Sequence, residues 1–235
     1  MSWSGPACAR CGLPFTSEQA LDAEPAVCAL CRNEAFDFDR ARSYGLYGGN
    51  LRAAILQLKF QRRERLGRRL GALMASSWKD LEDAGAGEAA VFVPVPLHST
   101  RERERGFNQA ELLARGLSAM LAKSRNKLAP RVEPRALRRT RATPPQTGLS
   151  LSARRENVRG VFAVSDPARV RDLVIVLVDD VMTTGATLSA CASALKGAGA
   201  AAVLALTLAR ATPEFGDFVA GSKSAVVDDF APPHP

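Results

Sequence analysis

The chain has 235 residues, of which 46% are hydrophobic and 24% charged, and its formal net charge is +8. This length suffices for one α/β domain with a small appended module. Its apolar runs are too short for a membrane helix of about 18 residues, and its first residues lack the basic start and apolar stretch of a signal peptide. We therefore expect a cytoplasmic protein without membrane insertion. If the positive charge is concentrated locally, it favours a polyanionic partner, either nucleic acid or a phosphorylated small molecule. If it is spread evenly, it indicates only an arginine-rich surface.

Taken in chain order, the sequence alternates between strand-like and helix-like segments. Residues 39–46 are weakly strand-like, and apolar residues then recur at helical spacing in 51–58 and 66–74. Further strand-like runs lie at 91–95, 161–164, 173–178 and 201–209, with amphipathic helices at 110–121 and 188–195. Strands that alternate with helices of this length indicate an α/β fold with a parallel sheet flanked by helices.

Composition divides the chain into three parts. Residues 1–35 hold four of the five cysteines but little apolar periodicity. A module this small cannot bury a core of its own, so it needs a cross-link to be stable. Residues 36–212 form the α/β domain. Residues 213–235, which end in APPHP, are expected to be a loose C-terminal tail.

The cysteines of the N-terminal module form two C-x₂-C pairs, Cys8 with Cys11 and Cys28 with Cys31, separated by sixteen residues. Each pair can offer two thiolates from one tight turn, and four thiolates complete a tetrahedron around Zn²⁺. Two disulfides are disfavoured in a cytosolic chain. A redox role is disfavoured because the C-x₂-C motif occurs twice and lies outside a βαβ unit. Four protein ligands leave no open position, so we expect a structural zinc ion. Cys191 lies on the apolar stripe of a helix and is interpreted as a core residue.

The strongest chemical pattern is segment 176–187, VLVDDVMTTGAT, which leaves a buried strand and enters the N-terminus of a helix. Open α/β sheets bind ligands at this place, and the free N–H groups of the helix favour a phosphate. Asp179 and Asp180 would repel a phosphate alone, but they suit a ligand that also presents hydroxyls and Mg²⁺. A sugar phosphate with a vicinal diol fits both features. The simpler alternative is an acidic turn followed by a helix cap.

This segment resembles the motif of type I phosphoribosyltransferases that binds phosphoribosyl pyrophosphate (PRPP). The resemblance implies that Asp179 and Asp180 hold the ribose hydroxyls with Mg²⁺. It also implies that the following loop holds the 5′-phosphate with Thr183, Thr184, Gly185, Ala186 and Thr187. Three further stretches narrow the resemblance to the ComF family: VPVPLH at 93–98, RGFNQ at 105–109, and RTRATPPQ at 139–146 with RENVRG at 155–160. The resemblance implies a type I phosphoribosyltransferase-like sheet preceded by a zinc-ribbon-like module.

Two basic stretches resemble loops of the same family. Segment 98–108 resembles the pyrophosphate loop, with Arg101, Arg105 and Asn108 as its binding residues, although Glu102 and Glu104 leave open a self-neutralised solvated turn. The basic segment 123–141 and the connection that follows it resemble the flexible loop that closes over PRPP and excludes water. That resemblance covers Arg139, Arg141, Gln146 and Arg155. A disordered basic loop is the alternative.

A second basic cluster lies at 59–69, where five arginines and a lysine accompany Phe60. Such a cluster can bind along a single nucleic-acid strand by charge and stacking, or it can be a solvated helix face.

Thr183 stands where purine-type enzymes of the family carry an acidic residue, which helps to transfer a proton of the purine. A threonine cannot act as a base for this proton at neutral pH. The sequence therefore looks unlike a purine-salvage enzyme.

Two functions remain open. The ComF resemblance implies a protein that binds Mg²⁺ and PRPP and acts in natural transformation, in contact with single-stranded DNA and the DNA-uptake machinery. The alternative is a metabolic phosphoribosyltransferase that transfers phosphoribosyl from PRPP to a non-purine acceptor and has no DNA role. Whether PRPP is turned over or only sensed is not indicated by these residues.

Overall fold

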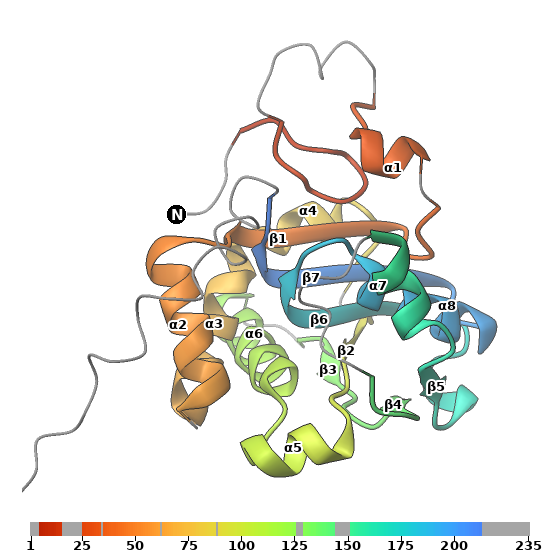
Figure 1. The fold of residues 1–235 in the computed structure, drawn as a ribbon. Helices are drawn as coiled ribbons and strands as arrows, with labels where there is room; N and C mark the ends of the chain where they lie inside the picture. Colours follow the sequence, from red (N-terminus) through yellow and green to blue (C-terminus); the bar gives the residue numbers. More distant parts are fainter. Residues whose placement is uncertain are drawn as a thin grey trace, which may run out of the picture.

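The chain folds around a five-stranded parallel sheet with the strand order β1-β7-β6-β2-β3 (Figure 1). A computed structural model describes residues 5–15, 25–33, 35–61, 63–87, 89–125, 129–143 and 151–212. The strands of this sheet are β1 (Arg40–Leu46), β2 (Val91–Pro94), β3 (Arg131–Val132), β6 (Val174–Met182) and β7 (Ala202–Arg210). Among these described residues, no helix is both long enough and apolar enough to cross a membrane.

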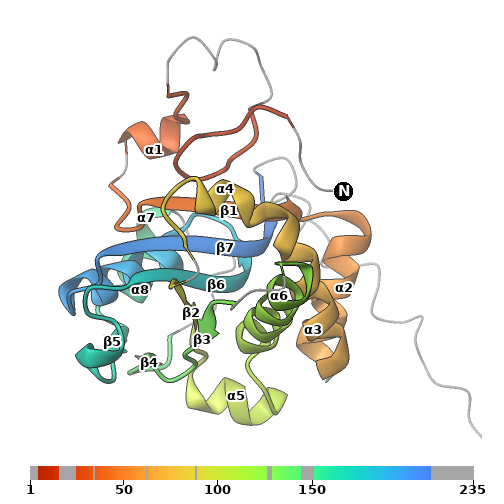
Figure 2. The same ribbon diagram turned by 180° about the vertical axis from the view of Figure 1, so that it is seen from behind.

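Helices cover both faces of the sheet, as a parallel sheet requires. One layer holds α2 (Gly49–Phe60), α3 (Glu64–Leu73) and α6 (Gln109–Arg125), and the other holds α7 (Leu151–Val158) and α8 (Ala186–Gly197) (Figures 1 and 2). In β6, Val176 and Val178 pack into the α2 layer, whereas Ile175 and Leu177 pack into the α8 layer. The remaining helices are short: α1 (Ala29–Asn33), α4 (Lys79–Glu82), α5 (Ser99–Arg105) and the 3₁₀ turns Met74–Ser77 and Pro167–Arg169.

Helices α3 and α6 lie side by side at very close range (Figure 2). A Cβ atom added at Gly71 would lie 2.1 Å from the carbonyl oxygen of Leu113, and one at Gly116 would lie 2.1 Å from that of Arg68. Backbones can meet at this distance only where side chains are missing, so both positions require glycine. The contact brings the basic side chains of α3 next to those of α6.

Two segments differ from what the sequence pattern indicates. The strand expected at 161–164 is β5 (Phe162–Val164), which pairs antiparallel with β4 (Leu137–Arg139) outside the main sheet. Residues 165–173 are too few for the crossover that would place β5 parallel to β6. Segment 98–108, expected as a loop, contains helix α5, which is capped by the His98 side chain and ends at Gly106 with φ +82°.

The cysteine module, residues 5–15 and 25–33, lies against the β1 edge of the sheet (Figure 1). The N–H of Ala41 donates to the carbonyl oxygen of Arg10 across 2.7 Å, which joins the module to β1. The four cysteines share an apolar cluster with Phe36, Phe38 and the α8 face of the sheet. The domain boundary at residue 35 stays a prediction, and the expected tail at 213–235 lies outside the described residues.

Candidate functional site

The acidic pair lies at the carboxyl end of β6, beside the N-terminus of α8. Pairing of β6 with β7 continues from Asp179 to Met182, so both carboxylates extend from a strand. Side chains alternate along a strand, and Asp180 therefore points into the α2 layer while Asp179 points toward α8. Asp180 is buried, with 5% of its surface exposed, and Asp179 is partly buried.

Lys59, in the last turn of α2, forms an ion pair with Asp180, in which Nζ lies 3.0 Å from Oδ2. Burial lowers the pKa of the Lys59 ammonium, but the charge and hydrogen bond of Asp180, followed by the charges of Asp179 and Tyr47, together raise it above the usual value. For Asp179, burial first and the charge of Asp180 second raise the pKa to about 7. The N–H of Asp180 donates to Asp179 Oδ1 across 2.8 Å and acts in the opposite direction.

Arginines from two further elements add positive charge near the acidic pair. Arg101 and Arg105 lie on α5, and Arg139 ends β4. Burial lowers the pKa of both Arg105 and Arg139, and the positive charge of Arg101 lowers both further. The carboxylates of Asp180 and Asp179 act in the opposite direction on the pKa of Arg105. At Arg139, the carboxylate of Asp179 opposes the shift. Within the described chain, Arg139 Nε is buried without a hydrogen-bond partner. This excess of positive charge around two carboxylates suits a ligand that carries both hydroxyls and phosphates.

The loop after β6 turns sharply into α8 at Gly185, which has φ +82°. The left-handed backbone favours glycine at this position, and a Cβ atom there would also lie 2.9 Å from Met182 Cε and 3.1 Å from Phe36 Cε1. Thr184 Oγ1 accepts from the Ala186 N–H across 3.4 Å. The first N–H groups of a twelve-residue helix thus face the region beyond the acidic pair, where a phosphate would be favoured.

The other residues expected at this site have different neighbours. Asn108 Nδ2 donates to the Val95 carbonyl and its Oδ1 accepts from Ala110 N, both across 3.0 Å, so it ties the end of β2 to the start of α6. The Arg155 guanidinium lies 5.5 Å from the ring centre of Phe36, beside the Gly185 loop. Arg141 is exposed and donates to the carbonyl oxygen of Arg159 across 3.2 Å. Gln146 lies outside the described residues.

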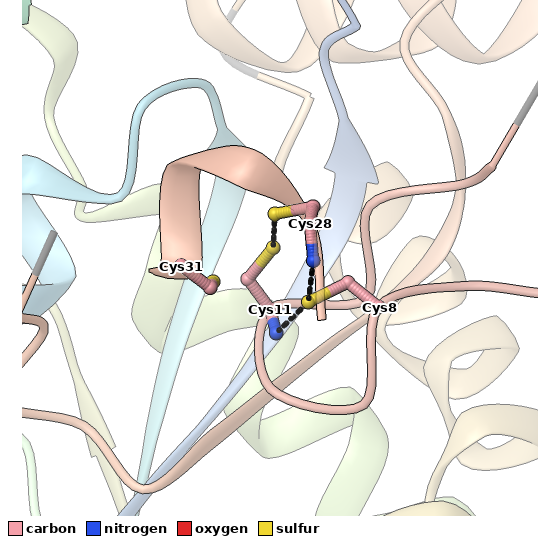
Figure 3. A group of neighbouring side chains, drawn as sticks. All are labelled: Cys8, Cys11, Cys28 and Cys31. Carbon is pink, nitrogen blue, oxygen red and sulfur yellow. Dashed lines mark hydrogen bonds between the residues drawn. The ribbon is translucent and has the colours of Figure 1, made fainter. Parts of the chain in front are cut away.

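A second candidate site is the cluster of Cys8, Cys11, Cys28 and Cys31, whose side chains converge from the turn at 8–12 and from the start of helix α1 (Figure 3). All four Sγ atoms lie within 4.8 Å of one another, and the Sγ atoms of Cys11 and Cys28 are 3.6 Å apart. A tetrahedron with Zn–S bonds of about 2.3 Å has edges of about 3.8 Å. Cys8 Sγ also accepts the N–H groups of Cys11 and Cys28, across 3.5 and 3.3 Å. These four buried, free thiols can therefore hold a metal ion in a closed site.

The thiols of this cluster shift one another's pKa in opposite directions. Hydrogen bonds from Cys11 and Cys31 lower the pKa of Cys8, whereas hydrogen bonds with Cys11 and Cys8 raise the pKa of Cys31. Against the opposing effect of Cys31, the contact with Cys8 and burial raise the pKa of Cys11 to about 12. Arg210, at the end of β7, is 2% exposed and directs Nη2 to Cys11 Sγ across 3.8 Å. Its buried guanidinium places a positive charge beside the sulfur atoms.

Exposed basic side chains form a third feature, a groove of about 720 Å³ between α3 and α6. Its lining includes Arg68, Arg69, Arg115, Met120 and Lys123. The cluster expected at 59–69 is divided: Arg63, Arg65, Arg68 and Arg69 are exposed, Arg62 lies outside the described residues, and Lys59 is turned to Asp180.

The expected basic segment 123–141 is also divided in the structure. Lys123 reaches the groove, whereas Arg131 pairs with Glu133 across 3.2 Å. Arg139 belongs to the surroundings of the acidic pair. The positive charge of this segment therefore serves different surfaces.

The sequence did not predict the site contacts of two residues, Lys59 at the acidic pair and Arg210 at the cysteine cluster. Lys59 follows Ile55 by four residues, which places it at the edge of the buried face of α2, and this spacing was a usable signal. Arg210 ends a nine-residue apolar strand, and no local pattern indicates that it faces cysteines 199 residues away.

Comparison with known proteins agrees with this geometry. The family model described as "Phosphoribosyl transferase domain" matches residues 104–218. The chain is 34% identical over 204 residues to the DNA utilization protein YhgH of Escherichia coli, covering 86% of this chain and 83% of that protein. It is 30% identical over 210 residues to competence protein F of Haemophilus influenzae (88% and 86% covered) and 28% identical over 211 residues to competence protein ComFC of Bacillus subtilis (88% and 79%). With its buried four-cysteine cluster and its parallel α/β sheet, the chain therefore belongs to the ComF family of phosphoribosyltransferase-like proteins.

Proposed function

We propose that this protein binds Mg²⁺ and PRPP at the end of β6 and acts in the handling of single-stranded DNA during natural transformation. The observation that supports the ligand most strongly is the charge arrangement of the site. Two carboxylates that suit a diol stand beside a helix N-terminus that suits a phosphate, and Arg101, Arg105 and Arg139 lie around them. The names of the relatives, a DNA utilization protein and competence proteins, support the DNA role.

In this proposal each group of residues has its own task. Asp179 and Asp180 accept hydrogen bonds from the ribose hydroxyls, and the first turn of α8 with loop 183–187 holds the 5′-phosphate. Arg101, Arg105 and Arg139 compensate the charge of the pyrophosphate. Bound Mg²⁺ would supply further charge neutralisation at the pyrophosphate oxygens.

For DNA, we propose the α3–α6 groove together with the exposed arginines that precede it. Arg68, Arg69 and Lys123 supply charge along the groove, and Met120 is 41% exposed within it. A positively charged groove that follows the phosphate backbone is one part of the arrangement by which proteins bind single strands without sequence preference. Arg115 pairs with Glu111 across 2.7 Å, so its charge is partly neutralised.

For the cysteine cluster, we propose one structural zinc ion held by Cys8, Cys11, Cys28 and Cys31. Four thiolates around Zn²⁺ leave two negative charges in a buried place, and the Arg210 guanidinium beside Cys11 opposes them. The thiols must stay reduced for this role, which agrees with a cytoplasmic location.

Calorimetric titration tests the PRPP proposal. We expect PRPP to bind in the presence of Mg²⁺ and to lose binding when EDTA removes the metal. Asp179→Ala combined with Asp180→Ala should weaken binding by about 3–5 kcal/mol, because two charged hydrogen-bonding partners of the diol are lost. Unchanged affinity in the double variant would overturn the site. PRPP turnover with a panel of nucleobases, measured in parallel, separates binding from transfer to a non-purine acceptor.

A further inference from the structure

Lys59 differs from the other basic residues of segment 59–69 in where its side chain lies. Its ammonium is 3.0 Å from Asp180 Oδ2, and the side chain is 22% exposed. Arg63, Arg65, Arg68 and Arg69 are exposed on the same segment. The position of Lys59 thus fits the acidic pair and not the surface that continues along α3.

The residue after Lys59, Phe60, also contacts a residue near the acidic pair. The ring centre of Phe60 lies 6.0 Å from the Arg105 guanidinium, which in turn donates to Gln109 Oε1 across 2.9 Å. With its guanidinium held there, Arg105 acts on Asp180 as a nearby charge. Among the described residues, Lys59 is the cation in direct ion-pair contact with Asp180. The last turn of α2 therefore contacts β6 and α5 at once.

We propose that Lys59 is a positioning residue of the phosphoribosyl site, which fixes the orientation of the Asp180 carboxylate and compensates its charge, and that it is not part of the nucleic-acid surface. This inference rests on the proposed binding of PRPP. A buried carboxylate without a counter-ion is strongly disfavoured, and Asp180 also lies next to the carboxylate of Asp179. Lys59 makes an adjacent acidic pair compatible with burial and holds one member in a single orientation.

Three variants test this role. Lys59→Met keeps the aliphatic stem and removes the charge, Lys59→Arg keeps the charge, and Lys79→Met is the matched control because Lys79 is an exposed lysine on α4. For each protein we would measure the dissociation constant of PRPP with Mg²⁺ by calorimetry. The dissociation constant of a fluorescent single-stranded oligonucleotide would be measured by anisotropy, and the unfolding temperature without ligand by calorimetric scanning.

Lys59→Met should weaken PRPP binding about tenfold or more, leave oligonucleotide binding within about twofold, and be largely rescued by Lys59→Arg. Lys79→Met should change neither affinity. The unfolding temperatures of Lys59→Met, Asp180→Asn and the double variant should be non-additive, because the two side chains interact directly.

The outcomes separate this inference from the proposal on which it rests. If the unaltered protein does not bind PRPP, the proposed function and the role of Lys59 both fall. If it binds PRPP and Lys59→Met binds it equally well, only the role of Lys59 is overturned. Loss of oligonucleotide binding with unchanged PRPP binding would return Lys59 to the nucleic-acid surface.

Discussion

Replacing Asp179 with Asn should stabilise the protein above pH 7 and have little effect near pH 4. Burial and the charge of Asp180 raise the pKa of Asp179 from 3.8 to about 7. The folded state therefore holds this proton more tightly than the unfolded state, and ionisation reduces stability progressively as the pH rises from about 4 to about 7. At about 1.36 kcal/mol per pKa unit the upper limit is about 4 kcal/mol. Because the side chain keeps some contact with solvent, we expect a stabilisation on the order of 1–3 kcal/mol.

Urea unfolding of both proteins between pH 4 and pH 8 measures this effect. The difference in the free energy of unfolding should grow up to about pH 7 and then level off, as expected for a carboxyl group whose pKa is raised by folding. Asp83→Asn is a suitable control because Asp83 is exposed, and its replacement should change the free energy of unfolding little. A difference for Asp179→Asn that is independent of pH, or a destabilisation at pH 8, would refute the electrostatic argument.

The remaining predictions concern the metal cluster, the helix contact and the DNA surface. Cys8→Ser should release bound metal and loosen the cysteine module, because a four-thiolate site contributes roughly 10–16 kcal/mol in small zinc modules; elemental analysis that finds no zinc in the unaltered protein, purified without chelator, would end this interpretation. Gly71→Ala should destabilise the fold by about 1–3 kcal/mol, since its Cβ atom would lie 2.1 Å from the Leu113 carbonyl oxygen, and an unchanged unfolding temperature would contradict the close helix contact. Arg63→Glu with Arg69→Glu should weaken single-stranded DNA binding and impair natural transformation in the host. In the unaltered protein that binding should lose about 0.7 log unit of affinity per log unit of salt for each phosphate neutralised, and an anisotropy titration at low salt without DNA binding would discard the DNA role.

The parts that could be predicted from sequence are those in which the chemistry is local in the chain. The spacing of the cysteine pairs predicted a four-thiol cluster, and the structure brings all four Sγ atoms within 4.8 Å of one another. The apolar run at 173–178 predicted a buried strand, and β6 lies at the centre of the sheet with helices packed on both of its faces. The strand, its acidic end and the helix that follows are continuous in the chain, so their arrangement needs little information from elsewhere.

The parts that could not be predicted depend on packing between distant segments. The contact of Lys59 with Asp180 exists because α2 packs on the face into which alternate residues of β6 point. The strand expected at 161–164 is β5, but its place outside the main sheet depends on antiparallel pairing with β4. Strand β4 has only three residues, too few for a pattern that predicts it from sequence. Arg139 was expected on a flexible loop, yet its position at the end of β4 brings it to the acidic pair.

The binding of PRPP at the end of β6 is tested most directly by a crystal structure of the protein grown with Mg²⁺ and PRPP. We expect the ribose hydroxyls within hydrogen-bond distance of the Asp179 and Asp180 carboxylates, and the 5′-phosphate at the first turn of α8 beyond Gly185. PRPP bound elsewhere on the protein, or a site without PRPP at saturating concentrations of ligand and metal, would contradict the assignment.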